Sequence, residues 1–503
     1  MSIHWPIIRT LLANPFANAV VDDRGPMSRG KLLAGALVLA DHLRRTCETR
    51  TVGVMLPTGG LFPMAALAGW MADRVVVPLN YLQAKDELQF VIDDCGADTI
   101  LTVGPMLEFL GHEPRVKNLM RLEDVDFTAM PEPRWPAMAA DDELAVLLYT
   151  SGTSGRPKGV RLTHGNITAN IRQIVEWVDF DSTHVVLGVL PQFHSFGMTV
   201  LTLLPLTVGA KAVYTARFVP GKIVRLFREF RPTCFVAIPS MYNALLHVKD
   251  ATADDFKSLV FAVSGGEPLP RALADRFKER FGITIAEGYG LTETSPVTNW
   301  CRPAEYKPGS VGGALPGVRE RIVCTESGRD LPPSADGEVR IAGPNVMRGY
   351  FNRPAETAAA FDEYGYLRTG DIGRLDEDGQ LFITGRLKEM LIIGGENVFP
   401  REIEEVLNAH PAVKDSGVVG THDPMRGEQP IAFIEVKEGE TVDERAMILW
   451  CRGKLAGYKV PAEVRVVPAL PRNATGKVMR RQLKALLGAG GAAGGAAGVG
   501  GAS

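Results

Sequence analysis

The sequence predicts an α/β protein: a large N-terminal domain of parallel sheets flanked by helices, a distorted antiparallel β subdomain, and a small α+β C-terminal domain. Apolar strand-like runs alternate with amphipathic helical runs between residues 28 and 281, which is the pattern of βαβ units. From Gly309 onward, short alternating strands separated by Gly and Pro turns replace that pattern. The chain has 503 residues, which is too long for one hydrophobic core and predicts more than one domain.

We expect a helix wherever apolar residues recur every three to four positions, and Ser28 is a suitable N-cap for the first one. The expected helices span residues 28–43, 61–72, 85–95, 221–230, 240–247 and 270–281. The expected strands of this half span residues 52–56, 75–77, 99–103, 144–148, 185–190, 234–238 and 259–263. Residues 111–143 are rich in Pro, Glu and Arg and are expected to cross the surface.

The antiparallel subdomain is predicted from four short strand-like runs with turn residues between them. These runs span residues 319–324, 337–341, 371–375 and 381–384. A separate α+β domain is predicted beyond the sequence GRLK at residues 385–388. Its expected helices and strands span residues 401–407 and 443–455, and residues 416–419 and 431–436.

The predicted domain limits follow from these changes in pattern. They are residues 1–385 for the N-terminal domain, 386–388 for the hinge, 389–487 for the C-terminal domain, and 488–503 for the tail. The tail contains mainly Gly and Ala, can bury little apolar surface, and is expected to be disordered.

Charge and composition exclude several functions. The net charge of −3 offers no broad basic surface for a nucleic acid. The six cysteines are scattered without a CxxC pair, which fits reduced thiols in a cytoplasmic protein better than disulfides or a zinc site. The N-terminus lacks the continuous apolar core of a signal peptide. The most apolar run, residues 197–210, is interrupted by Pro205, so we expect a buried helix and no transmembrane segment.

The stretch YTSGTSGRPKG, residues 149–159, is suited to binding a polyphosphate. It follows an apolar strand and brings glycines, four hydroxyl residues and Lys158 into one turn. Glycine lets backbone N–H groups approach a ligand, the hydroxyl groups add donors, and Lys158 adds a positive charge. It is not the P-loop pattern, because no Ser or Thr follows Lys158.

This loop resembles the phosphate loop of the adenylate-forming superfamily, which includes acyl-CoA synthetases, aryl-CoA ligases, amino-acid adenylation domains and beetle luciferases. Further motifs of that family follow in its order, so the resemblance covers roughly residues 28–487. It implies an enzyme that joins a carboxylic acid to ATP as an acyl-adenylate, releases pyrophosphate, and transfers the acyl group to a thiol. The implied cofactors are ATP, Mg²⁺ and coenzyme A, and the implied C-terminal domain is mobile.

The resemblance assigns the nucleotide-binding residues motif by motif. Phosphate binding falls to Thr150, Ser151, Gly152, Thr153, Ser154, Gly155 and Lys158. The motif Glu287-Gly288-Tyr289-Gly290 continues to Thr292 and Glu293. In it, Tyr289 packs on adenine, Thr292 touches the α-phosphate and Glu293 ligates Mg²⁺, an ion that suits one or two carboxylates plus phosphates.

Two more motifs complete the nucleotide site. Gly265, Gly266 and Glu267 follow a strand of the predicted parallel sheet, at the edge where such sheets bind ligands. By resemblance they border the adenine and one wall of the acid pocket. Asp371 is implied to accept hydrogen bonds from the ribose hydroxyls, and Arg386 to make a second ribose or phosphate contact.

The C-terminal domain carries residues for both half-reactions. Lys477, in the motif PRNATGK, is implied to bridge the substrate carboxylate and the α-phosphate, where an ammonium stabilises the transition state. Lys388 occupies the hinge position. Gly394 and Gly395 are implied to let the pantetheine arm of the thiol pass closely. Some family members carry a lysine at the position of Ile392, and this chain lacks it.

The motif Pro191-Gln192-Phe193-His194 resembles the acid-side motif of the family, with His194 beside the substrate carboxylate. Members that activate amino acids carry an aspartate there, so His194 argues against an amino-acid substrate. The neighbouring residues are apolar and fit an alkyl or aryl acid, although most of that stripe is expected to be ordinary core.

The reading favoured by these motifs is a medium- or long-chain fatty acyl-CoA synthetase. An acyl-carrier-protein ligase and an aryl-CoA ligase remain open, because the pantetheine arm is common to both thiols. A non-catalytic nucleotide-binding protein is disfavoured, since Lys158, Glu293, Asp371, Arg386 and Lys477 are all present. The sequence does not decide the oligomeric state, and a homodimer stays open.

Overall fold

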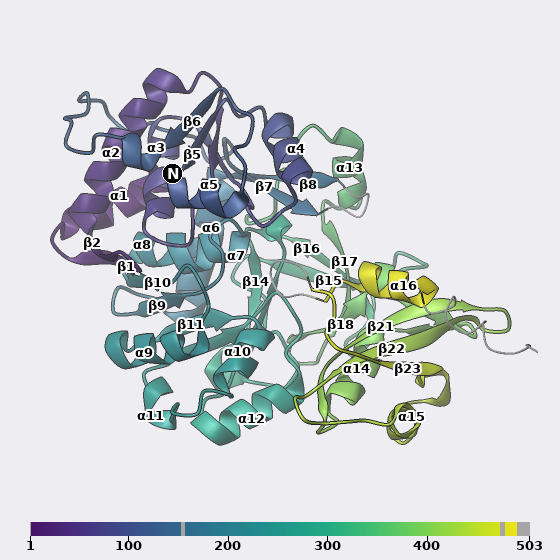
Figure 1. Cartoon of the computed structure of the whole chain (residues 1–503). Helices are drawn as coiled ribbons and strands as arrows, with labels where there is room; N and C mark the ends of the chain where they lie inside the picture. The colour runs from purple at the N-terminus through teal and green to yellow at the C-terminus, as the bar shows by residue number, and fades with distance from the viewer. Residues whose placement is uncertain (1, 152–155, 473–477, 490–503) are drawn as a thin grey trace, which may run out of the picture.

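The computed structural model describes residues 2–151, 156–472 and 478–489. It confirms the predicted α/β class: two largely parallel sheets with helices, an antiparallel sheet, and a C-terminal domain beside it (Figure 1). The C-terminal domain, coloured yellow-green, lies next to the antiparallel sheet in Figure 1.

The first sheet has six strands and ends in the hairpin that carries the phosphate loop. Its order is β6 (Asn118–Arg121), β5 (Thr99–Thr102), β3 (Thr51–Val54), β4 (Val75–Pro78), β7 (Leu144–Ser151) and β8 (Pro157–Thr163). The strands are parallel except for the antiparallel pair β7–β8. Every residue of β3, β4 and β5 is buried, as expected for parallel strands covered on both faces.

The second sheet has eight strands. Its order is β14 (Val297–Trp300), β13 (Ala286–Gly290), β12 (Phe261–Ser264), β11 (Cys234–Ala237), β9 (Val185–Gly188), β10 (Lys211–Tyr214), β1 (Asn18–Asp22) and β2 (Gly25–Ser28). Its central strands are parallel, and the two edge pairs β1–β2 and β13–β14 are antiparallel. One predicted adenine motif lies in the turn after β12 and the other begins within β13, so this sheet positions one side of the site.

Helices cover both sheets. They are α1 (His4–Ala13), α2 (Arg29–Thr46), α3 (Leu61–Met71), α4 (Lys85–Cys95), α5 (Gly104–Leu110), α6 (His164–Val178), α7 (Ser195–Met198), α8 (Leu204–Val208), α9 (Pro220–Phe230), α10 (Pro239–Leu245), α11 (Ala253–Phe256), α12 (Arg271–Phe281) and α13 (Pro354–Ala360). The Ser28 hydroxyl caps α2 by accepting from the Lys31 amide, as predicted. All of α3 after Leu61 is buried, which explains its lack of a polar face.

The antiparallel sheet carries the ribose motif. Its order is β15 (Arg319–Val323), β16 (Gly337–Ala342), β17 (Leu367–Leu375) and β18 (Leu381–Arg386). In the β17–β18 ladder Asp371 lies opposite Arg386. Two residues that the sequence separates by fifteen positions are therefore neighbours.

The C-terminal domain is an α+β unit. It contains β19 (Leu391–Ile393), β20 (Glu396–Val398), α14 (Pro400–Asn408), β21 (Val413–Asp423), β22 (Gly427–Val436), α15 (Glu444–Arg452), β23 (Glu463–Val467) and α16 (Arg480–Ala489). Its buried apolar residues, such as Ile403 and Ile434, form clusters of their own, separate from the main core. The 3₁₀ turn Leu387–Glu389 connects it to β18.

Several expectations need correction. Residues 111–143 are not only a surface crossing, because Asn118–Arg121 pairs with β5 as an edge strand. The run 197–210 is helical and buried, but it is split into α7, a π-helical segment (Thr199–Leu203) and α8. Helix α16 extends through Ala489, two residues into the predicted tail, since Gly488 and Ala489 continue its ladder. Residues 490–503 lie outside the described part of the chain.

All six cysteines are free thiols, which agrees with the absence of paired spacing in the sequence. Within the described ranges, no helix combines the length and the apolarity needed to cross a membrane.

Candidate active site

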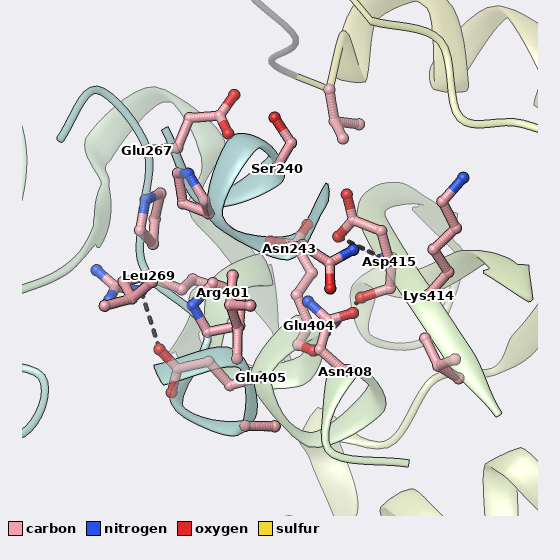
Figure 2. Close-up of a pocket in the computed structure, with 18 of the residues that line it drawn as sticks. Ser240, Asn243, Glu267, Leu269, Arg401, Glu404, Glu405, Asn408, Lys414 and Asp415 are labelled. Atoms are coloured by element: carbon pink, nitrogen blue, oxygen red, sulfur yellow. Dashed lines mark hydrogen bonds and ion pairs between the residues drawn. The ribbon is translucent and has the colours of Figure 1, made fainter. Parts of the chain in front are cut away.

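A cavity of about 1120 Å³ lies between the large domain and the C-terminal domain. On the large-domain side its walls include Gly266, Glu267, Tyr289, Asp371 and Arg386. Helix α14 forms the opposite wall, and Figure 2 shows its Arg401, Glu404, Glu405 and Asn408 side chains near Ser240 and Asn243 of α10. The volume is ample for a nucleotide, given that ligand pockets usually measure about 300–1,000 Å³.

The ribose motif forms a hydrogen-bonded group within this cavity. The Tyr289 hydroxyl donates to Asp371 Oδ2 at 2.7 Å, and Arg386 Nε pairs with Asp371 Oδ1 at 2.8 Å. Asp371 is only 2% exposed, and its carboxylate raises the pKa of the Arg386 guanidinium. Burial, and then the charge of Asp371, raise the pKa of Tyr289 well above its ordinary value. Asp371 is thus an acceptor held in place by two donors.

The phosphate loop is the tip of the β7–β8 hairpin. Thr150 lies opposite Lys158, and Ser151 opposite Pro157, in the antiparallel ladder. The Tyr149 hydroxyl donates to Asp94 Oδ2 of α4 at 2.7 Å, which anchors the base of the hairpin. Four predicted phosphate contacts, Gly152, Thr153, Ser154 and Gly155, lie outside the described residues.

Lys158 and Glu293 are brought together by a tyrosine that sequence reasoning missed. The Lys158 ammonium lies 5.4 Å from the ring centroid of Tyr350 and pairs with Glu356. The Tyr350 hydroxyl donates to Glu293 Oε1 at 3.0 Å. No spacing in the sequence marks Tyr350, because it follows a turn about 190 residues after the hairpin that it contacts.

Glu293 is a half-buried residue beside Tyr350. Burial raises the pKa of its carboxylate, and a backbone hydrogen bond, the Tyr350 hydroxyl and the positive charge of Arg386 oppose that shift. A carboxylate drawn away from water gains stability from a nearby cation, so its environment fits a Mg²⁺ ligand. Among the described residues no group of three or more acidic, His or Cys side chains could hold a metal ion.

The glycines of the adenine motifs permit close contacts. A Cβ on Gly290 would lie 1.9 Å from the Pro296 carbonyl oxygen, and one on Gly265 would lie 2.6 Å from the Phe196 ring. Gly266 has φ +82°, a conformation that side chains rarely adopt. Gly288 and Gly290 line the cavity, whereas Gly265 instead packs against the acid-side motif.

The acid-side motif, which contains His194, adjoins the nucleotide motif. The Ser195 hydroxyl lies 3.4 Å from the Thr292 hydroxyl, which connects the two motifs. Burial lowers the pKa of His194 to about 4, so its imidazole is neutral at pH 7. Its Nε2 is buried and has no hydrogen-bond partner among the described residues. His194 is therefore a neutral group with one unsatisfied polar atom.

One aromatic ring packs directly against His194, and a second packs against the first. The Phe193 ring packs 4.8 Å from the His194 ring and edge-on, also at 4.8 Å, against Tyr81. The rest of the apolar stripe, including Met198, Val200 and Leu201, lies in the main core, as expected. The side of the site around His194 is thus apolar and aromatic.

The C-terminal domain contributes residues on either side of its PRNATGK motif to the cavity wall. Arg472 and Val478, which flank residues 473–477, line it, and Arg472 pairs with Asp415 at 2.5 Å. Lys477 itself lies outside the described residues. Lys388 is exposed on the 3₁₀ turn at the domain junction. Gly394 and Gly395 lie on the exposed β19–β20 turn with φ of +62° and +87°, outside the cavity wall.

Comparisons with known proteins agree with this geometry. A family model described as AMP-binding enzyme matches residues 9–351, and one described as AMP-binding enzyme C-terminal domain matches residues 402–477. A long-chain-fatty-acid–CoA ligase of Bacillus subtilis (strain 168) is 38% identical over 355 residues, which is 69% of this chain and 62% of that protein. A feruloyl-CoA synthase of Amycolatopsis sp is 32% identical over 95% of this chain and 98% of that protein.

Solved structures are similar over nearly the whole chain. The crystal structure of ATP-bound MatB from Rhodopseudomonas palustris has a TM-score of 0.87 and 30% identity, covering 97% of this chain and 99% of that chain. The anthranilate CoA ligase AuaEII in complex with anthranoyl-AMP has a TM-score of 0.89 and 26% identity, covering 97% and 98%.

Fold and comparisons together define an α/β enzyme with a distinct C-terminal domain and a cavity beside it. The chain belongs to the AMP-binding enzyme family, and thus to the adenylate-forming superfamily.

Proposed function

We propose that the protein is an acyl-CoA ligase that converts a medium- or long-chain fatty acid to its CoA thioester. The observation that carries this proposal is the arrangement of Asp371, Arg386 and Tyr289 around one cavity, with Lys158, Tyr350 and Glu293 close by. These groups provide a fixed ribose acceptor, a cation for phosphates and a carboxylate for a metal. In this proposal the N-terminal domain ends at residue 385 and the C-terminal domain begins at residue 389.

In the first half-reaction, a carboxylate oxygen of the acid attacks the α-phosphorus of ATP and pyrophosphate leaves. Asp371 accepts from the ribose hydroxyls, and Lys158 neutralises charge on the leaving pyrophosphate. Thr292 contacts the α-phosphate, and Lys477 bridges it to the acid. Mg²⁺ held by Glu293 supplies further charge neutralisation for the phosphates when bound. Fixing the two reactants in one geometry accounts for much of the rate gain.

His194 contributes as a neutral hydrogen-bonding group. Its imidazole has a pKa lowered to about 4 by burial, so it does not form an ion pair with the acid at neutral pH. Nε2, which is unsatisfied in the structure, instead orients the carboxylate by a hydrogen bond.

In the second half-reaction, the thiol sulfur attacks the acyl carbon and AMP leaves. The thiol donor is CoA, and Gly394 and Gly395 line its path after the C-terminal domain has rotated about Lys388. Arg472 and Val478, and not the Gly394-Gly395 turn, line the cavity, which supports assigning this orientation to adenylate formation.

The aromatic and apolar groups around His194 support an acid with an apolar tail. An aryl acid is a second candidate, favoured by the nearly full-length similarity to a feruloyl-CoA synthase. A carrier-protein thiol would use the same path as CoA, and it is the alternative acceptor.

Acid-dependent pyrophosphate release over a panel of acids tests the substrate. We expect octanoate, dodecanoate and hexadecanoate to drive release, and free amino acids not to do so. A preference for ferulate or 4-coumarate would replace the fatty-acid assignment by the aryl one. Comparable turnover with any standard amino acid would contradict both. Supplying CoA or a phosphopantetheinylated carrier protein in the second step then identifies the acceptor.

A further inference from the structure

Arg401 spans the boundary between the two domains. It lies in the first turn of α14, and its side chain is only 15% exposed. Its Nη1 donates to the carbonyl oxygen of Ile383 in β18, a strand of the large domain. Its Nε pairs with Glu405 Oε1, one turn further along α14, at 3.0 Å. Figure 2 shows Arg401 and Glu405 facing each other at the cavity wall.

The charge of the same guanidinium also acts on a buried carboxylate of the large domain, without forming an ion pair with it. Glu287 is 7% exposed and opens the adenine motif in β13. The Leu269 amide donates to Glu287 Oε2 at 3.2 Å. Burial raises the pKa of Glu287, and the positive charge of Arg401 is the largest influence opposing that shift. The C-terminal domain therefore provides the counter-charge for a carboxylate in the nucleotide motif of the other domain.

Ile383 and Glu287, the two groups of the large domain on which Arg401 acts, lie next to the nucleotide site. Ile383 precedes Arg386 by three residues in β18, and Glu287 precedes Tyr289 by two residues in β13. All four line the cavity. Because Ile383 and Glu287 belong to the large domain, a rotation of the C-terminal domain would take Arg401 away from both. A contact that exists in only one orientation shifts the equilibrium toward that orientation.

We propose that Arg401 is a positioning residue for acyl-adenylate formation: by its hydrogen bond to Ile383 and by its charge near Glu287 it holds the C-terminal domain in the orientation seen here. The inference rests on the proposed function, in which this orientation forms the adenylate. Arg401 needs no contact with substrate for this role. It acts through the domain orientation that places Arg472 and Val478 at the cavity wall.

Three variants separate this role from a general effect on α14. Arg401→Ala removes the hydrogen bond to Ile383 and the positive charge near Glu287, and it should lower kcat/KM for ATP in pyrophosphate release about 10- to 100-fold, the usual range for a charge-assisted hydrogen bond. Thioester formation from supplied acyl-adenylate should change less than about threefold. Arg401→Lys keeps a cation and a donor and should restore part of the loss. Glu405→Gln removes only the contact within α14 and should lower kcat/KM clearly less than Arg401→Ala does.

A double-mutant cycle tests the partner. If Arg401 acts through Glu287, the loss caused by Arg401→Ala should be smaller in a Glu287→Gln background, where no buried charge needs compensation. Equal loss of both half-reactions in Arg401→Ala, no rescue by lysine, or an equally large effect of Glu405→Gln would overturn the inference.

A readout without substrate keeps the inference independent of the proposed activity. Small-angle X-ray scattering of the full chain should show a broader distribution of domain arrangements in Arg401→Ala than in wild type. Identical scattering profiles would overturn the positioning role. Absence of acyl-adenylate formation by the wild-type protein would instead overturn the proposed function.

Discussion

Among single residues, Glu293 is the proposed metal ligand, and its surroundings support that role. Burial raises the pKa of its carboxylate, while a backbone hydrogen bond, the Tyr350 hydroxyl at 3.0 Å and the charge of Arg386 oppose that shift. A carboxylate drawn away from water gains stability when a cation binds it. We therefore propose that a cationic ligand, and not a contribution to folding, explains Glu293.

Exchange of Glu293 for Ala should leave the fold intact and reduce pyrophosphate release about 10²–10³-fold, as for loss of one preorganised electrostatic group. High Mg²⁺ should restore only part of the activity, because phosphates still provide ligands. Tyr350→Phe is the matched control: it removes one hydrogen bond and should cost about tenfold or less. Normal turnover of the Glu293 variant, or its unfolding in circular dichroism, would contradict the assignment.

Among the secondary-structure elements, the junction of β14 and β15 joins the eight-stranded sheet to the antiparallel sheet that carries Asp371. Glu320 of β15 and Asn299 of β14 lie at this junction, and their Oε1 and Oδ1 atoms are buried without hydrogen-bond partners among the described residues. Burial raises the pKa of Glu320 to about 8, with an opposing hydrogen bond from Asn299. The Glu320 and Asn299 oxygen atoms therefore lie close together without a hydrogen-bond donor from the described part of the chain. A protonated Glu320 carboxyl would supply one.

Glu320 should make stability fall as the pH rises. Its folded pKa of about 8 lies above the ordinary value, so the folded state binds one proton more than the unfolded state between pH 4.5 and 8. The stabilisation is complete below pH 4.5 and is lost toward pH 8, at up to about 1.4 kcal/mol per pH unit. Glu320→Gln, whose amide supplies the donor, should flatten this dependence. Denaturant unfolding at pH 5, 7 and 8.5 measures it, and parallel curves for both proteins would contradict the assignment.

The 3₁₀ turn Leu387–Glu389 is the element about which the C-terminal domain is proposed to rotate. Lys388 lies in its centre and is exposed. A 3₁₀ turn has φ of about −50° to −70°, which overlaps the value that proline imposes. Proline at position 388 is therefore compatible with the orientation observed and restricts others.

Lys388→Pro should spare pyrophosphate release within about threefold and slow thioester formation tenfold or more, because proline restricts the φ change that a hinge needs. Measuring each half-reaction separately, with purified acyl-adenylate for the second, provides the comparison. Lys388→Ala serves as the control for loss of the charge alone. An equal effect of proline on both half-reactions would argue against a hinge at this position.

For the whole molecule, the two half-reactions proposed above need different groups at one acyl carbon. Arg472 and Val478, which flank residues 473–477, line the cavity, while Gly394 and Gly395 lie on an exposed turn of the same domain. We propose that the C-terminal domain rotates between the half-reactions, so that each of its two functional segments in turn serves one active site.

Lys477→Ala should therefore reduce adenylate formation about 10²–10³-fold, the loss expected for one preorganised charge-stabilising donor. It should leave thioester formation from supplied acyl-adenylate largely unchanged. Lys484→Ala, which removes a lysine from the exposed face of α16, controls for charge loss in this region. If Lys477→Ala loses both half-reactions to the same degree, alternation between two orientations is wrong for this chain.

The sequence by itself determined the fold class, most elements of both parallel sheets, and the motifs around Lys158, Tyr289, Asp371 and Arg386. Those features depend on residues close together in the chain, through hydrophobic periodicity, capping and turn chemistry. Only the tertiary structure decided that Tyr350 links Lys158 to Glu293 and that burial keeps His194 neutral. It also decided that the charge of Arg401 in one domain acts on Glu287 in the other. Such contacts depend on burial and on distances between segments far apart in sequence, and no local pattern records either.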